Sequence, residues 1–227
     1  DWPLGTRPGA IPADLTPHLV AEGSDVRGDY AALLACAWGA PSAAFGAMYE
    51  RFDHGRTVPR LPGPPYHFMS RVVACDCPAG EATEGGGLAA EYDVPPDAWY
   101  FRDNGAAAMP ISVLMEVMLQ PCGWLASYMG FALTDGDLAF RNLDGDWAVP
   151  TATVGPDAGT LTVRTRLTRY SRVGEMTIVF FRVDCDGSNH RDHLGFGQKI
   201  EQRGVDRVDL ADEAAPPRRE RRHRLPP

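Results

Sequence analysis

The longest apolar stretch of the chain contains a single charged side chain, and this combination constrains the fold more than any other feature. The stretch runs from Met109 to Met129, and Glu116 is the only formally charged residue between Asp103 and Asp135. A segment this apolar must be buried, and its length is typical of one long helix. Burial removes water from the carboxyl group of Glu116, so we expect a raised pKa and a proton available for chemistry.

The same stretch is nearly long enough to cross a bilayer. However, Glu116, Gln120 and Pro121 lie at its centre, and no basic cluster flanks either end. A buried core helix is therefore the better interpretation, and no membrane partner is predicted. Because Gln120 follows Glu116 by four residues, the two side chains would share one face of that helix.

Length and charge narrow the class of protein. A chain of 227 residues suffices for one full domain with extra elements, or for two small domains. The net charge of −8 argues against a nucleic-acid-binding surface spread over the whole molecule. The sequence opens without a charged and then apolar leader, so we expect a cytoplasmic location.

The five cysteines are an odd number and form no zinc pattern. One residue separates Cys75 from Cys77, and strand alternation would place both sulfurs on one face of an extended segment. Free thiols in a reducing cytoplasm are the favoured interpretation. His190 and His193 form one short cluster, a weak signal for a metal, so the sequence predicts no metal site and no cofactor.

Periodic patterns divide the chain into a lead-in, a main domain and a tail. We expect the lead-in to span residues 1–58, with short helices over residues 30–38 and 42–52. The main domain is expected over residues 59–200, followed by a basic, disordered tail over residues 201–227. One apolar stripe of the second helix would pack against the main domain: Phe45, Met48, Tyr49 and Phe52.

Extended segments are predicted on both sides of the long helix. The proline-rich segment 60–65 is the entrance to the main domain, because proline disfavours both helix and central strand. A short aromatic element over residues 99–101 leads to the helix. This order favours an α+β domain in which an antiparallel sheet wraps around one buried helix. Strands are expected at residues 66–77, 88–94, 138–143, 160–170 and 175–185, and with a weaker pattern at 190–198.

Two neighbouring segments carry a family resemblance. Residues 91–101 are followed by Met109-Pro110, by Val113-Leu-Met-Glu116 and then by Gln120. This pattern resembles the hotdog-fold β-hydroxyacyl-acyl carrier protein dehydratases. Within that family it is most similar to the dehydratase domains of polyunsaturated fatty acid and polyketide synthases.

The resemblance implies a hotdog fold and the elimination of water from a 3-hydroxyacyl thioester carried on an acyl carrier protein. In such enzymes a histidine removes the α-proton, and a carboxylic acid on the central helix protonates the departing hydroxyl. Glu116 matches the position of the acid, and Gln120 matches the polar residue one turn later. Ile111 falls where these enzymes usually have a glycine, whose backbone N–H would polarise the thioester carbonyl.

The histidine that the resemblance implies shortly before Met109-Pro110 is missing. Asn104 lies in that segment, but its amide cannot accept a proton at neutral pH. His67 is the nearest histidine with a plausible interior position, where ordinary packing competes with catalysis as its role. The candidate catalytic residues are Glu116 and His67, and the candidate substrate-binding residues are Asn104, Met109, Ile111 and Gln120.

Three functional hypotheses follow. Such dehydratases build the active site between two hotdogs, so this chain would be the acid-donating half of a double hotdog or dimer. Alternatively, it is an inactive scaffold or acyl-binding half of a fatty acid or polyketide synthase, with Glu116 satisfied by Gln120. A third hypothesis is an acyl-thioester hydrolase, because hotdogs also host that chemistry.

Overall fold

The computed structural model describes most of the chain, including all of the predicted long helix. The predicted tail at residues 201–227 and, within the lead-in, residues 1–19 and 21–24 lie outside the described residues. Those that the structure describes are Val20 and residues 25–54, 57–134, 138–142, 145, 153–174, 176–187 and 190–198, the last range as backbone only.

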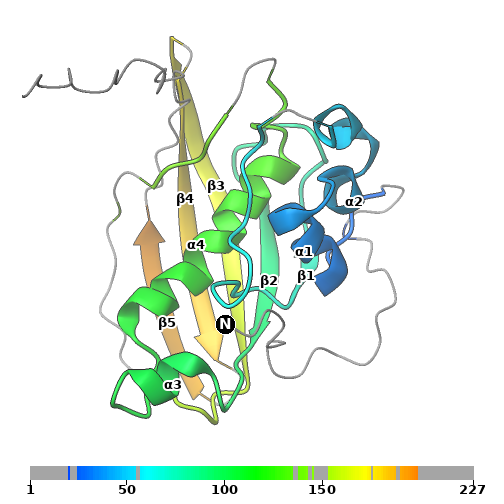
Figure 1. Ribbon diagram of the computed structural model, residues 1–227. Helices are drawn as coiled ribbons and strands as arrows, with labels where there is room; N and C mark the ends of the chain where they lie inside the picture. Colours follow the sequence, from blue (N-terminus) through cyan, green and yellow to red (C-terminus); the bar gives the residue numbers. More distant parts are fainter. Residues whose placement is uncertain are drawn as a thin grey trace, which may run out of the picture.

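Five antiparallel strands form one sheet, and a long helix, α4 (Ile111–Tyr128), lies against one face of it (Figure 1). Neighbours in the sheet follow the order of the sequence, β1-β2-β3-β4-β5. The predicted α+β architecture, with an antiparallel sheet and a buried central helix, is confirmed. The strands are β1 (Arg71–Cys75), β2 (Gly87–Asp93), β3 (Thr160–Val173), β4 (Met176–Gly187) and β5 (His190–Gln198).

Side-chain alternation along β3 explains why the sheet has a dry and a wet face. Leu161, Val163 and Leu167 are buried on the side of α4, whereas Arg164 and Arg166 between them are exposed. This is the pattern of an antiparallel strand with one solvated face, as predicted. In β4 a run of three buried residues, Val179 to Phe181, interrupts the alternation, and the guanidinium of Arg169 lies 3.8 Å from the ring centroid of Phe180.

Helix α4 forms the centre of the core, with twelve of its residues buried. Trp124 and Tyr128 stack at 5.2 Å between ring centroids, and both are fully buried. The helix continues through Pro121, although this residue has no N–H to donate to the preceding turn. Packing within one chain therefore buries most, but not all, of the predicted apolar stretch.

Short N-terminal helices cover the C-terminal half of α4, whereas its N-terminal half extends beyond them (Figure 1). Phe45 packs against Trp124 at 5.3 Å between ring centroids, and the hydroxyl of Tyr49 donates to the carbonyl of Ser127 at 2.7 Å. The predicted stripe of the lead-in is thus part of the core. These helices are α1 (Tyr30–Trp38), α2 (Ser42–Phe45) and a 3-10 helix, η1 (Gly46–Phe52).

Three predicted elements differ from the structure. The described residues 138–142 are not in a strand; Leu138 and Phe140 instead pack as half-buried side chains on the core. The aromatic segment begins a short helix, α3 (Trp99–Asp103). Strand β1 begins at Arg71 and not at residue 66, because the backbone around His67 is bonded to a side chain of α4 and not to a neighbouring strand.

The end of α4 depends on a glycine. The N–H of Gly130 donates to the carbonyl of Ser127, and the N–H of Phe131 donates to that of Ala126, both at 3.0 Å. This is the Schellman arrangement, in which the residue after the helix adopts a left-handed conformation. Gly130 has φ of 81°, and a Cβ there would lie 2.9 Å from the carbonyl oxygen of Gly80.

Gly130→Ala is therefore expected to lower the free energy of unfolding by about 1–2 kcal/mol, because alanine is strained in this conformation. Gly123 provides a matched control within the same helix, where an added Cβ meets no atom within 4 Å. Gly123→Ala should raise the free energy of unfolding by up to about 1 kcal/mol. Urea unfolding of both variants checks this, and equal effects of the two substitutions would contradict it.

Candidate functional site

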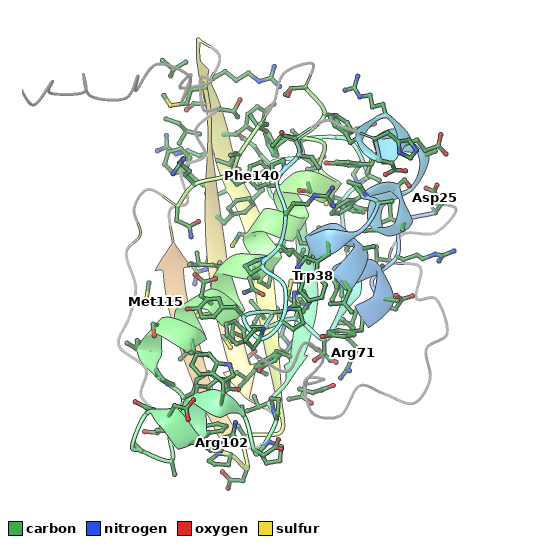
Figure 2. All side chains as sticks on the ribbon, in the orientation of Figure 1. Asp25, Trp38, Arg71, Arg102, Met115 and Phe140 are labelled. Carbon is green, nitrogen blue, oxygen red and sulfur yellow. The ribbon has the colours of Figure 1, made fainter. Side chains whose placement is uncertain are left out.

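Glu116 lies on the part of α4 that the N-terminal helices leave uncovered. Its side chain is half-buried, as are those of Met115 and Leu119, and Ile111 at the start of the helix is 42% exposed. Met115 points away from α1 (Figure 2). Burial raises the pKa of the Glu116 carboxyl, and a hydrogen bond from Gln120 opposes that rise without cancelling it. The raised pKa expected from the sequence is confirmed.

Gln120 is buried and joins α4 to the segment before β1. Its Oε1 accepts a hydrogen bond from the backbone N–H of Phe68 at 2.8 Å, and its Nε2 donates to the carbonyl of Tyr66 at 2.9 Å. These two bonds fix which end of the amide carries the hydrogens, and the second hydrogen on Nε2 can be donated to the Glu116 carboxylate. Gln120 therefore holds the acid and the backbone on either side of His67 in one network.

His67 is 3% exposed, and its protonation state follows from its partners. Nδ1 lies 2.9 Å from the carbonyl oxygen of Pro62, which can only accept, so Nδ1 carries the proton. Burial lowers the pKa of the ring, although the backbones of Pro62 and Met69 act in the opposite direction. The neutral ring thus has its lone pair on Nε2, which is buried and without a hydrogen-bond partner among the described residues.

A cavity of about 160 Å³ lies beside His67, under helix α3. Trp99 and Tyr100 of that helix line it together with Pro65, and the exposed Arg102 is at its edge. Glu116 is not among the described residues that line this cavity. The structure thus links the two candidate catalytic residues through Gln120 and the backbone, but it does not bring them into one cavity.

The remaining candidates surround the start of α4. The backbone N–H of Met109 donates to Val154 at 2.8 Å, and its side chain is buried. The exposed Asn104 donates from Nδ2 to the carbonyl of Ala108 at 2.9 Å, which closes the loop before the helix. Ile111 is the first residue of α4, where backbone N–H groups have no partner within the helix. Of these residues, Ile111 is the one whose backbone N–H lies at the start of the helix.

Sequence reasoning missed a group of tyrosines around His67. Tyr30 of α1 meets the imidazole edge to face at 5.6 Å between ring centroids. The hydroxyls of Tyr92 and Tyr100 lie 3.1 Å apart, and both side chains are buried. In the sequence Tyr92 and Tyr100 both lie within residues 91–101, but no spacing signal joins them to Tyr30 or to His67.

Two classes of feature are absent from the part of the chain that the structure describes. No group of three or more histidine, cysteine or acidic side chains is placed to hold a metal ion there. The same residues include no helix with both the length and the hydropathy that a membrane span requires.

His67 should make stability depend on pH in a definite direction. Its folded pKa is lowered from the ordinary 6.5, so the unfolded chain binds the additional proton first as the pH falls. The free energy of unfolding should therefore decrease below pH 6.5, by at most about 1.4 kcal/mol per pH unit from this group. The decrease continues until the pH reaches the lowered folded pKa.

His67→Phe should remove the contribution of His67 to the pH dependence of stability. His54→Gln, which replaces an exposed histidine, should leave that contribution in place. Urea unfolding of the parent and both variants between pH 7.5 and pH 5.5 measures the difference. An identical pH dependence in the parent and in His67→Phe would show that the buried imidazole does not titrate in this way.

Comparisons with known proteins bear on the family to which the chain is similar. Residues 61–189, more than half of the chain, match the model of the FabA-like domain family. One of the subunits of the polyunsaturated fatty acid synthase of Thraustochytrium sp. is 33% identical over an alignment 156 residues long, which covers 62% of this chain and 10% of that protein. The chain therefore spans about a tenth of the length of this curated relative.

A solved structure, the dehydratase heterocomplex ApeI:P from Xenorhabdus doucetiae, also aligns with the chain. The TM-score is 0.42 and the identity is 15%, over 65% of this chain and 89% of that chain. Likeness at this level carries no argument about the site, which therefore depends on the contacts and burial of this chain's own residues.

Proposed function

The chain belongs to the FabA-like domain family, with the hotdog fold, and we propose that it acts in the dehydration of a 3-hydroxyacyl thioester to the 2-enoyl thioester. The observation that carries this proposal is the half-buried Glu116 on the uncovered part of α4, with its raised pKa. The similarity to part of a polyunsaturated fatty acid synthase supports the same class of reaction.

In the proposed reaction, Glu116 is the general acid. Its raised pKa increases the fraction of protonated carboxyl near neutral pH, which is the form that can give a proton to the departing hydroxyl. Gln120 orients the carboxyl from one turn away, and the backbone N–H of Ile111 would polarise the thioester carbonyl. Water leaves as a base removes the α-proton, so the products are the enoyl thioester and one water molecule.

We assign the base to a partner. His67 is neutral and has its lone pair on Nε2. However, Glu116 is not among the described residues that line the cavity beside His67. Asn104 cannot replace a histidine as a base. A second hotdog carrying a histidine would complete the site.

The uncovered face of α4 supports a partner at this position. Ile111, Met115 and Leu119 surround Glu116 with apolar surface that is only partly covered within the chain. A second hotdog packed on this face would bury these side chains and withdraw Glu116 further from water. The substrate would arrive on an acyl carrier protein, consistent with a fatty acid or polyketide synthase of the cytoplasm.

A second candidate function is an inactive scaffold or acyl-binding half of such a synthase. Gln120 already gives the carboxyl of Glu116 a hydrogen-bond partner, which is what a purely structural buried acid requires. The missing histidine favours the same interpretation. Under this alternative, Glu116 contributes to stability and not to turnover.

The test is co-expression of the chain with a histidine-bearing hotdog dehydratase domain, followed by an assay of crotonyl thioester hydration. Glu116→Gln should lower turnover by about 10²–10⁴-fold because it removes the proton donor. The exposed Glu81, as Glu81→Gln, is the matched control and should leave turnover unchanged.

Thermal unfolding of the same variants separates the two functions. The dehydratase proposal expects Glu116→Gln to fold with a Tm equal to or above that of the parent. If turnover is unchanged while the Tm falls, the scaffold is supported and the acid role is refuted.

A further inference from the structure

Two thiols face each other at the edge of the sheet, in a region that the proposed function does not use. Cys75 is the last residue of the edge strand β1, and Cys77 follows in the turn toward β2. Their Sγ atoms lie 3.6 Å apart and share a hydrogen bond. The two sulfurs lie on one side, as predicted, although the strand ends at Cys75 and the turn, not strand alternation, places Cys77 there.

The two thiols differ in exposure and in acidity. Cys75 is half-buried, whereas Cys77 is 7% exposed. The hydrogen bond from Cys77 lowers the pKa of Cys75, although burial acts in the opposite direction. The pKa of Cys77 is raised, because it faces that developing thiolate and is buried. Cys75 is therefore the thiol that ionises first and the one that a small molecule can reach.

Contacts on three sides hold the turn in place. The backbone N–H of Asp76 donates to the carbonyl of Gly87 at 3.0 Å, and its carboxylate bonds Arg166 of β3 at 3.0 Å. The hydroxyl of Tyr128 donates to the carbonyl of Cys77 at 2.9 Å, which joins the turn to the last turn of α4. The facing sulfurs are thus part of a fixed turn.

The other three cysteines provide a contrast within the same chain. Cys36, Cys122 and Cys185 are buried to 3% exposure or less. Burial raises the pKa of Cys36 to about 11 and that of Cys185 to about 12, and it raises the pKa of Cys122 as well. They therefore have little thiolate at neutral pH and little access to reagents.

We propose that Cys75 and Cys77 form a reversible dithiol–disulfide site that exchanges with small-molecule disulfides such as glutathione disulfide. The Cys75 thiolate attacks one sulfur of the disulfide and releases one glutathione thiolate, which leaves a mixed disulfide on Cys75. The Cys77 thiol then loses its proton and attacks the Cys75 sulfur, which releases the second glutathione. Two protein thiols and one glutathione disulfide become one protein disulfide and two glutathione molecules.

Only a small movement separates the two states. A disulfide bond is about 2.05 Å long, so the sulfurs must approach by about 1.5 Å from their contact distance. Because Tyr128 is bonded to the carbonyl of Cys77, the oxidation state would act directly on the contact between β1 and the end of α4. The proposal does not depend on the dehydratase function, since none of its residues belongs to the Glu116 site.

In the test, the purified chain is equilibrated with glutathione buffers of decreasing reduced-to-oxidised ratio. Each sample is then quenched with acid and labelled with N-ethylmaleimide under denaturing conditions. Peptide mass spectrometry should show that the peptide with both cysteines loses its two labels together and regains them after dithiothreitol. Cys36, Cys122 and Cys185 should remain fully labelled throughout. Retention of both labels at every ratio, or a mixed disulfide that persists on the parent chain, would overturn the proposal.

Two variants separate the roles of the thiols. Cys77→Ser should accumulate one glutathione on Cys75, because the second thiol is missing. Cys75→Ser should react at least about tenfold more slowly than the parent, because the more acidic and accessible thiol is gone. Equal reaction rates of the parent and Cys75→Ser would refute the assignment of Cys75 as the attacking thiol.

Discussion

The pair of hydrogen bonds that Gln120 makes to the backbone of Tyr66 and Phe68 is the interaction on which the arrangement of the site depends. It takes the place of a strand partner for the backbone around His67, which directly follows the proline-rich segment 60–65. It also fixes the rotation of α4 about its axis, because a buried amide with both ends bonded has one permitted position. Glu116, one turn earlier, receives its orientation from the same amide.

The two halves of α4 differ in how completely they are packed and in what they contribute. The C-terminal half, enclosed by the sheet and by Phe45 and Tyr49, supplies the stability of the core. The N-terminal half retains a partly covered apolar face with one carboxyl group in it. An isolated chain thus keeps Glu116 in contact with both water and apolar surface, which raises its pKa without removing it from reach of a substrate.

The main elements of the fold and the candidate acid could be predicted from the sequence, because the patterns that indicate them are local. A run of apolar residues with one charge specified α4 and singled out Glu116, and alternation specified β3. The signals failed where tertiary partners decide the structure: residues 138–142 have a strand pattern but no strand partner, and residues 66–68 bond a helix side chain. Tyr30 and His67 lie far in the sequence from Tyr92 and Tyr100, so no pattern in one segment could group the four side chains.

The central claim is that α4 holds Glu116 as an acid weaker than an ordinary glutamate. The most direct measurement is a carboxyl carbon NMR titration of the chain, with the resonance assigned by its loss in Glu116→Gln. The account predicts a midpoint clearly above 4.5, the ordinary value for this side chain. A midpoint at or below 4.5 would contradict it, because the carboxyl would then be ionised throughout the neutral range and have no proton to give.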